Sequence, residues 1–499
     1  MREQYRMTND GMNESSPVLS ASSETFAKIV LYACSGVYLA AFVACALISA
    51  FGPDEFQHVQ MGWLISQGEI PYRDFFEHHT PAYHFLLSAV LRYLPVSTSA
   101  DAAIQALFAF RIVGVGLSTA VVALTFVLSA KYFGRLGALF AVVLLAASTA
   151  FVSVAVEIRP DQMASVLLLA GTLAIDRARD SNKPRLWLVL SGFAVALSVM
   201  TTQKVVFALP GYGFLLGVLF SAKGNSLRQS GSDLALVLLP ALVVGLVPVW
   251  YFFSHGALAD FVRDNFLLGM RWDHMPGPWI SRLTEMGQND VLLIAFVSVG
   301  LWRTWRLPKT RSTWVLALIS PGISLFLLAP LFPVVRSDYF FLLLPYAAVM
   351  AAAGADYCAR TNVSDKVPVV AILAIVAAVH GAVMVFSPLA GTNNRGDLEK
   401  LRYVIETTSQ NATVVSSWTP GIAFRRPAFF YYSLHDEIVR VMPPEARSRL
   451  EDTLFGGRSP PELVEVDKAF RDNFPDYARR IGTQYTATGV GTLWRRTRR

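Results

Sequence analysis

Acidic and imidazole side chains crowd residues 52 to 84, GPDEFQHVQMGWLISQGEIPYRDFFEHHTPAYH, directly after a long apolar stretch. Carboxylates there can do general acid or base chemistry, and together with imidazoles they can ligate divalent metal ions. The adjacent acids Asp54 and Glu55 come first. They also fit a capping box that starts an amphipathic helix ending near Gly68, so a purely structural role stays open.

A metal site is one use for this loop, with Asp54, Glu55, His58, His78 and His79 as ligand candidates. Oxygen and imidazole ligands suit several divalent ions. The spacing of these residues follows no tight ligand motif. We therefore expect no cofactor and keep a divalent metal as the alternative.

The composition indicates a membrane protein. Hydrophobic residues make up 54% of the 499, charged residues 16%, and the mean hydropathy is +0.43, which excludes an ordinary soluble protein. The net charge of +7 comes from basic residues in short loops and at the C-terminal tail, a pattern that reports membrane topology. We expect membrane lipids as neighbours and no nucleic acid.

Apolar runs long enough to span a bilayer, about 20 residues each, recur from residue 27 to residue 386. They predict an all-α polytopic domain over 27–386 with about eleven transmembrane helices. A cytoplasmic polar tail (1–26) precedes it and an extracytoplasmic domain (387–499) follows. The predicted spans are 28–51, 107–130, 136–156, 161–176, 186–201, 205–221, 234–254, 290–302, 313–331, 339–355 and 367–386.

The basic loops set the orientation. As one helix, residues 186–220 would reach roughly 50 Å, well beyond a hydrocarbon core of about 30 Å, so the chain must turn back near Thr201 to Lys204. The segments that flank the two resulting helices are both basic and belong on the cytoplasmic side. The first loop (52–106), the turn 157–161, Lys204, and the loop 255–289 with its surface-lying helix then face outward.

The region after residue 386 has ordinary soluble composition. Its pattern predicts a helix over 397–408, a strand over 412–417, and helices near 445–454 and 461–473. A small mixed α/β domain outside the membrane follows from this order.

Several segments together resemble the membrane glycosyltransferases of the GT-C fold. The similar branch contains the bacterial aminoarabinose and galacturonic acid transferases and the protein mannosyltransferases. The segments are Asp54-Glu55, PYRDFFEHHTPAYHFLL, Arg111, EIRPDQ (157–162), Thr202-Gln203-Lys204, and FPVVRSDYFFLLLP (332–345). The resemblance implies a polyprenyl-phosphate-linked sugar donor and chemistry on the outer face of the inner (plasma) membrane. The acceptor is then a glycan, lipid A, lipopolysaccharide or a protein.

This chemistry needs a base for the acceptor hydroxyl, and a carboxylate near apolar walls has a pKa raised toward a useful range. Asp54 is our first choice, with Glu55 in support. Asp161 matches a second acidic position of the family and could orient the acceptor or the base, although helix capping explains it equally.

The leaving phosphate needs cationic contacts. Lys204 is the strongest candidate, because an ionised lysine in an apolar stretch is costly unless it meets an anion or snorkels to the interface. Arg159 and Arg336 could instead be interfacial anchors that pair with the neighbouring Asp161 and Asp338. His79 stands near a position where the aminoarabinose transferases have lysine, so its phosphate contact is in doubt, since histidine is only partly charged near neutral pH. The remaining candidates, for substrate binding, are Tyr72, His78 and Tyr339.

Two other classes stay open. A transporter or flippase of lipid-linked sugars also needs many spans, but transporters usually gather polar groups at the bilayer midplane within repeated halves. Here the charged residues gather at the outer boundary, and the sequence shows no internal repeat. A non-catalytic scaffold for envelope polysaccharide assembly would have a similar sequence.

Overall fold

The structure is a computed structural model of the 499-residue chain. It describes residues 21–224, 226–268, 278–328, 331, 337–361, 372–373, 375–380, 382–383, 393–416, 423–431, 434, 439–440, 442–456 and 460–497.

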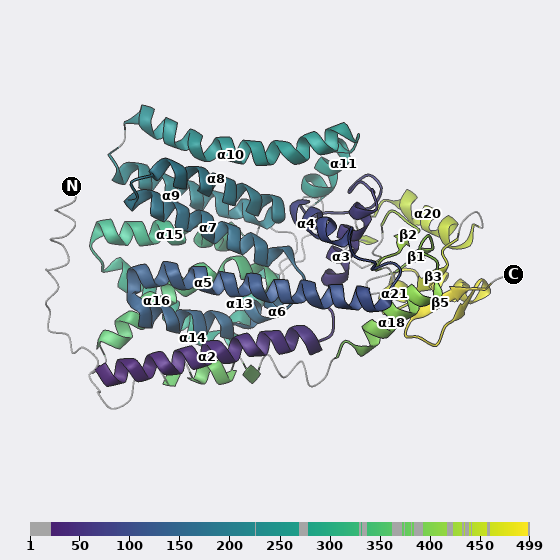
Figure 1. The fold of residues 1–499 in the computed structure, drawn as a ribbon, viewed down its shortest axis with the longest axis horizontal. Coiled ribbons are helices and arrows are strands. Elements are labelled where there is room, and N and C mark those ends of the chain that lie inside the picture. Colours follow the sequence, from purple (N-terminus) through teal and green to yellow (C-terminus); the bar gives the residue numbers. More distant parts are fainter. Residues whose placement is uncertain are drawn as a thin grey trace.

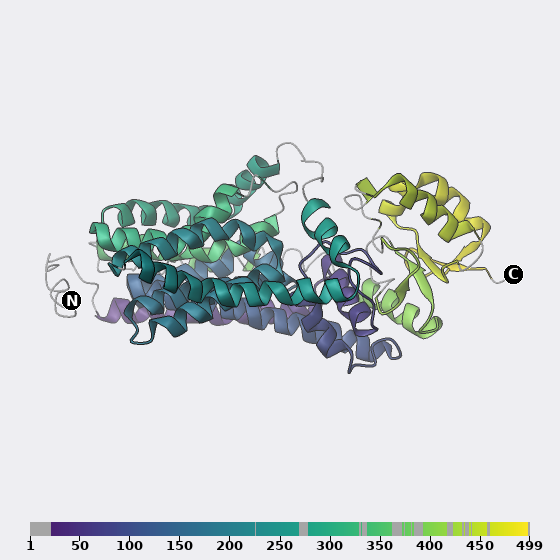
Figure 2. The same ribbon diagram turned by 90° about the horizontal axis from the view of Figure 1, so that it is seen from above.

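Long apolar helices run side by side in a bundle, and a smaller α/β domain stands at one end (Figures 1 and 2). Helices α3 and α4 lie between the two parts. The main bundle helices are α2 (Ala21–Ile48), α5 (Ala100–Ala147), α7 (Pro160–Asp180), α8 (Pro184–Thr201), α9 (Leu209–Ala222), α10 (Leu227–Ser254), α14 (Val291–Trp305), α15 (Lys309–Leu328) and α16 (Leu344–Thr361).

Six of the described helices are long and apolar enough to cross a membrane. They are α2, α5, α8, α10, α15 and the pair formed by η2 (Gln203–Ala208) with α9. The multi-pass, all-α prediction is therefore confirmed. The number eleven stays a prediction, because α14 is only 15 residues long and half of the residues in the span predicted at 367–386 lie outside the described residues.

Two turns predicted from the sequence are present. Gly134 has φ +75°, a left-handed conformation that suits glycine, and it breaks α5 into two arms that correspond to the predicted spans 107–130 and 136–156. The short helix α6 (Thr149–Ala155) follows the second arm. The other turn separates α8 from η2 at Thr202, as the length argument requires.

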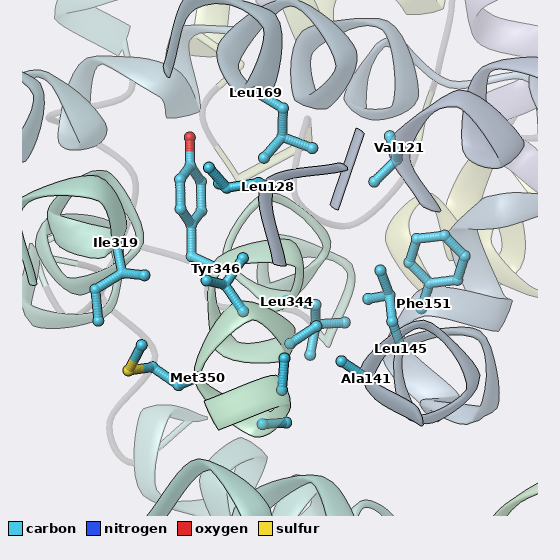
Figure 3. Packing of buried hydrophobic residues seen from close by; sticks show 14 of the residues in the cluster. Val121, Leu128, Ala141, Leu145, Phe151, Leu169, Ile319, Leu344, Tyr346 and Met350 are labelled. Atoms are coloured by element: carbon cyan, nitrogen blue, oxygen red, sulfur yellow. The ribbon is translucent and has the colours of Figure 1, made fainter. Parts of the chain in front are cut away.

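The bundle core is held by close packing around α16. In Figure 3, Tyr346 of α16 lies among Leu128 of α5, Leu169 of α7 and Ile319 of α15. Glycines allow the closest crossings: a Cβ at Gly211 would lie 2.0 Å from the carbonyl oxygen of Ser320. Small residues at such crossings let helix backbones approach in membrane proteins.

The polar loops at the domain end form short helices. These are α3 (Pro53–Ser66), α4 (Ala82–Leu91), α11 (Leu258–Val262), the π-helix η3 (Arg263–Leu267) and α13 (Pro278–Asn289). The loop 255–289 thus contains helices as predicted, while residues 269–277, within its expected flexible cover, lie outside the described residues.

The described part of the C-terminal domain contains a five-stranded sheet of order β2-β1-β3-β5-β4 with helices beside it. β1 pairs in parallel with β2 and β3, whereas β5 pairs antiparallel with β3 and β4. Its elements are α18 (Arg395–Thr407), β1 (Thr413–Val415), β2 (Arg426–Pro427), α20 (Pro444–Phe455), β3 (Leu463–Glu465), α21 (Lys468–Asn473), α22 (Pro475–Arg480), η7 (Ile481–Thr483), β4 (Tyr485–Ala487) and β5 (Leu493–Arg496).

The predicted helix over 461–473 is wrong in its first half. Residues 463–465 form β3, the central strand, and only 468–473 are helical. All three strand residues are buried, because neighbouring strands pair on both sides. A three-residue buried run carries no helical or strand period, so only the sheet decides its state.

This domain shares its core with the polar loops. The side chain of Gln60 in α3 donates to the carbonyl of Arg425 at 2.6 Å and accepts from the backbone N–H of Phe424 at 2.7 Å. The backbone N–H of Phe76 donates to the carbonyl of Phe430. The C-terminal domain therefore braces both α3 and the loop that follows it.

Candidate active site

Helix α3 begins at the site. Its N-cap is Gly52, Pro53 occupies the first helical position, and the Glu55 carboxylate accepts the Gly52 N–H at 2.6 Å. The helix ends at Ser66, and Gly68 has φ +89°, as the capping box and the glycine predict. Asp54 and Glu55 therefore both stand in the first turn.

Glu55 is fully buried and its carboxylate is fully used. It accepts two hydrogen bonds from Arg111, at 2.7 and 2.6 Å, and one from the backbone N–H of Ile158 at 3.1 Å, besides that of Gly52. Arg111 also donates to carbonyls at the end of α2, among them Ala50 at 2.8 Å. Glu55 thus joins α2, α3, α5 and the turn before α7. The sequence-based catalytic and metal-binding assignments are not supported for it.

The Asp54 side chain points away from Glu55 and toward a row of charged side chains. Its carboxylate lies 2.8 Å from Nη1 of Arg159, whose Nε is 3.3 Å from Asp161. The second oxygen of Asp161 accepts from Lys204 Nζ at 2.9 Å. Side chains from α3, from the start of α7 with its N-cap Arg159, and from η2 therefore meet.

Lys204 is the last residue in this row of charged side chains, and it lies beside an aromatic ring. Its ammonium lies 4.1 Å from the centre of the Tyr339 ring, a cation–π contact. The Lys204 side chain is 12% exposed and that of Asp161 only 1%. Asp161 thus holds two cations in place, while Lys204 stands nearer to the solvent. Arg336, the other predicted phosphate contact, lies outside the described residues.

A second cluster surrounds Glu77, which sequence reasoning did not select. One Glu77 oxygen accepts from His79 Nδ1 at 2.7 Å and from the backbone N–H groups of His78 and His79. In the described part of the chain, Glu77, His78 and His79 are the group whose ligand atoms lie close enough to hold a metal ion. The predicted set with Asp54 and Glu55 does not gather in this way, and His58 instead lies with its Nδ1 3.0 Å from His84 Nε2.

Burial keeps the two loop histidines neutral. Burial, and then the nearby Lys204, lower the pKa of His79 to about 4, and burial next to His79 lowers the pKa of His78 to about 3. Neutral His79 donates from Nδ1 to Glu77, which leaves Nε2 as an acceptor. His79 therefore does not serve as the predicted cationic contact for a phosphate.

Tyr72 supports the loop from behind. Its side chain is buried between Phe252 and Phe261, and its hydroxyl donates to the carbonyl of His79 at 2.6 Å. The residue has φ +68°, a strained conformation that this contact helps to hold. A direct contact with substrate is not supported for Tyr72, whereas His78, with an 18% exposed side chain, remains a candidate.

Glu157, like Glu77, was not selected from the sequence. It occurs in the EIRPDQ segment, but that segment alone does not show where its side chain points. In the structure it lies 3.3 Å from the same Nη1 of Arg159 that Asp54 contacts. Burial raises the pKa of Glu157 to about 7; Arg159 opposes this shift, and Glu55 and Asp54 add to it.

Comparisons with known proteins agree with this architecture. Residues 96–252, which include Arg111, the 157–162 segment and Lys204, match the family model described as dolichyl-phosphate-mannose-protein mannosyltransferase. No curated protein sequence matches the chain.

Among solved structures, the chain is similar to ArnT from Cupriavidus metallidurans, determined bound to undecaprenyl phosphate and in the apo state. The identities are 12% and 13%, both TM-scores are 0.64, and the matches cover 93% of this chain and 97% and 96% of those chains. It is also similar to the oligosaccharyltransferase AglB from Archaeoglobus fulgidus, in complex with an inhibitory peptide and a dolichol-phosphate. That match has 12% identity and a TM-score of 0.55, and covers 96% of this chain and 75% of that one. These likenesses confirm the GT-C fold.

Proposed function

We propose that the chain is a membrane glycosyltransferase that moves a sugar from a polyprenyl-phosphate donor to a hydroxyl group of an envelope acceptor. It would act on the extracytoplasmic face of the inner membrane. The acceptor class comprises lipopolysaccharide, lipid A, another glycan or a protein, and the sugar is a hexose or pentose.

One observation carries this proposal: carboxylates and a lysine from separate segments meet at the end of an apolar bundle. Asp54, Arg159, Asp161 and Lys204 are linked by contacts of 2.8 to 3.3 Å, although α3 and η2 are far apart in sequence. Such a site suits a donor whose tail stays in lipid while its phosphate reaches the polar boundary. The lipid phosphates bound by ArnT and AglB have this form.

Each of the named side chains has its own role in the transfer. Lys204 and Arg159 stabilise the charge that develops on the departing phosphate, because charge-assisted hydrogen bonds are stronger in a site of low polarity. Asp161 fixes the positions of both cations. Asp54, at 17% side-chain exposure, accepts a charge-assisted hydrogen bond from the incoming hydroxyl, which orients the hydroxyl toward the sugar and makes its oxygen more nucleophilic.

The fold explains why these groups can work at a membrane boundary. Arg111 and Glu55 join the end of α2 to the start of α3, so Asp54 is held at the end of an apolar helix. Lys204 is held at the turn between α8 and α9. A lipid-borne phosphate moving between these helices would meet both residues.

The test is reconstitution of the purified full chain into liposomes. The probes are radiolabelled undecaprenyl-phosphate mannose, galacturonic acid and aminoarabinose, and the acceptor is an envelope extract that retains its lipopolysaccharide and lipid A. We expect label from one donor to appear in the acceptor, and we expect Asp54→Asn and Lys204→Ala to abolish it. Asp101→Asn is the matched control, because Asp101 is an exposed acid paired with Arg402 outside the site.

Two results would contradict the proposal. Normal transfer with Asp54→Asn would remove this residue from the reaction. Movement of intact donor across the bilayer without transfer of its sugar would favour a flippase. In cells, loss of one envelope sugar modification with normal levels of inserted Asp54→Asn protein is the corresponding expectation.

A further inference from the structure

We propose that Glu157 is a second catalytic carboxylate of this site and receives the proton of the acceptor hydroxyl while Asp54 orients that hydroxyl. This inference rests on the proposed glycosyl transfer. It assigns a role to a residue that neither the sequence motifs nor the fold comparisons assign.

The geometry brings two carboxylates to one guanidinium nitrogen. Arg159 Nη1 lies 2.8 Å from Asp54 Oδ2 and 3.3 Å from Glu157 Oε2, so these two oxygens lie within about 6 Å of each other. Both carboxylates can therefore approach one acceptor hydroxyl that lies beside Arg159. The shorter contact belongs to Asp54, whose charge is therefore more strongly engaged by Arg159.

Glu157 is partly buried, but it is the least buried of the three acids that contact Arg159. Its side chain is 26% exposed, compared with 17% for Asp54 and 1% for Asp161. Its Oε1 lies above Gly52, since a Cβ built on Gly52 would be 3.0 Å from that oxygen. The absence of a side chain at Gly52 thus leaves room for the Glu157 carboxylate at the start of α3.

Several acids crowd around one cation at the site. Within the described residues, Asp54, Glu157 and Asp161 all contact the guanidinium of Arg159, and Asp161 also pairs with Lys204. Glu55 and Asp161 are each tied to a cation and almost fully buried. Burial raises the pKa of Glu157 to about 7; Arg159 opposes this shift, and Glu55 and Asp54 add to it, so Glu157 can take up a proton near neutral pH.

In the transfer step, the acceptor oxygen forms a bond to the anomeric carbon of the sugar. The bond from that carbon to the phosphate oxygen breaks, and its electron pair leaves with the polyprenyl phosphate. The hydroxyl proton moves to the Glu157 carboxylate, which later releases it to solvent. A base whose pKa lies near the working pH is the most effective for such a transfer.

The test is the pH–rate profile of transfer in the liposome assay with the undecaprenyl-phosphate sugar that the wild-type protein uses. In the wild type, we expect the rate to fall as the pH drops through about 7. Glu157→Gln should lower the rate by roughly 100-fold or more, the usual effect of losing a general base, and should abolish this acid limb. Glu157→Asp, which keeps a carboxylate, should retain the limb at a reduced rate.

Controls separate chemistry from folding. Glu406→Gln removes a half-exposed glutamate in α18 that pairs with Arg402 outside the site, and it should leave the profile unchanged. If Glu157→Gln does not insert, the wild-type profile still decides, because a rate independent of pH between 5 and 8 overturns the proposal. An unchanged rate and acid limb in Glu157→Gln also overturns it.

The two proposals fail in different ways. If the wild-type protein transfers no sugar from any donor, the proposed function fails. If the wild type transfers sugar and Asp54→Asn does not, but Glu157→Gln behaves like wild type, only the role of Glu157 fails.

Discussion

The adjacent acids Asp54 and Glu55 should respond to substitution in opposite ways. Glu55→Gln removes the negative charge opposite Arg111, and both side chains are at most 1% exposed. Breaking a buried ion pair by neutralising one partner costs about 3–5 kcal/mol, because the other charge is left uncompensated. Glu55 also accepts the N–H groups of Gly52 and Ile158, so the expected loss lies at the upper end of this range.

Asp54→Asn should cost far less. Arg159 keeps Glu157 and Asp161 as partners, and the Asp54 side chain is partly exposed. Because these two carboxylates still compensate the charge of Arg159, no uncompensated buried charge is left behind. We therefore expect Asp54→Asn protein to be inserted and stable but inactive, whereas Glu55→Gln protein should be scarce and unfold at a lower temperature.

The assay compares the amount of full-length protein in membranes and its thermal unfolding after purification in detergent. A double variant, Glu55→Gln with Arg111→Met, adds a sharper control, because it leaves no unpaired charge. It should recover part of the lost stability, but not all, since Arg111 also holds carbonyls at the end of α2. The reasoning is refuted if Glu55→Gln is as stable as Asp54→Asn.

Three further outcomes are expected. Gly211→Ala should destabilise the bundle by about 1–3 kcal/mol or more, as overpacking does, because the added Cβ would lie 2.0 Å from a carbonyl oxygen of α15. Gly245→Ala is the control, because a Cβ there would have nothing within 4 Å, and thermal unfolding of the two variants tests the difference. Gln60→Leu leaves a buried N–H and a buried carbonyl of the C-terminal domain unpaired, at about 1–3 kcal/mol each, so limited proteolysis should cut this domain faster than in wild type. Since the folded pKa values of His78 and His79 are lowered to about 3 and 4, the unfolded chain binds more protons as the pH falls from about 6.5 to about 4. Stability should fall across this window, and His78→Asn should make the fall less steep; an unchanged slope would contradict the lowered pKa.

Local patterns determined the bundle and its turns. A stretch that is apolar for about 20 residues has no alternative to burial in lipid or core, and the length of 186–220 required a turn at Thr201 to Lys204. The start of α3 could also be predicted, because the residues that form its first turn, Gly52, Pro53 and Glu55, are neighbours in sequence. Each of these features depends on residues close together in the chain.

Only the tertiary structure separated the roles of the acids. Glu55 meets Arg111 across 56 positions, and Asp161 meets Lys204 across 43. The strand at 463–465 likewise exists because β1 and β5 lie on either side of it. Sequence indicated which side chains could ionise at the membrane boundary. The tertiary structure decides which of these side chains is neutralised, which is exposed and which shares a cation. The reason is that burial and contacts with distant segments arise only when the helices pack.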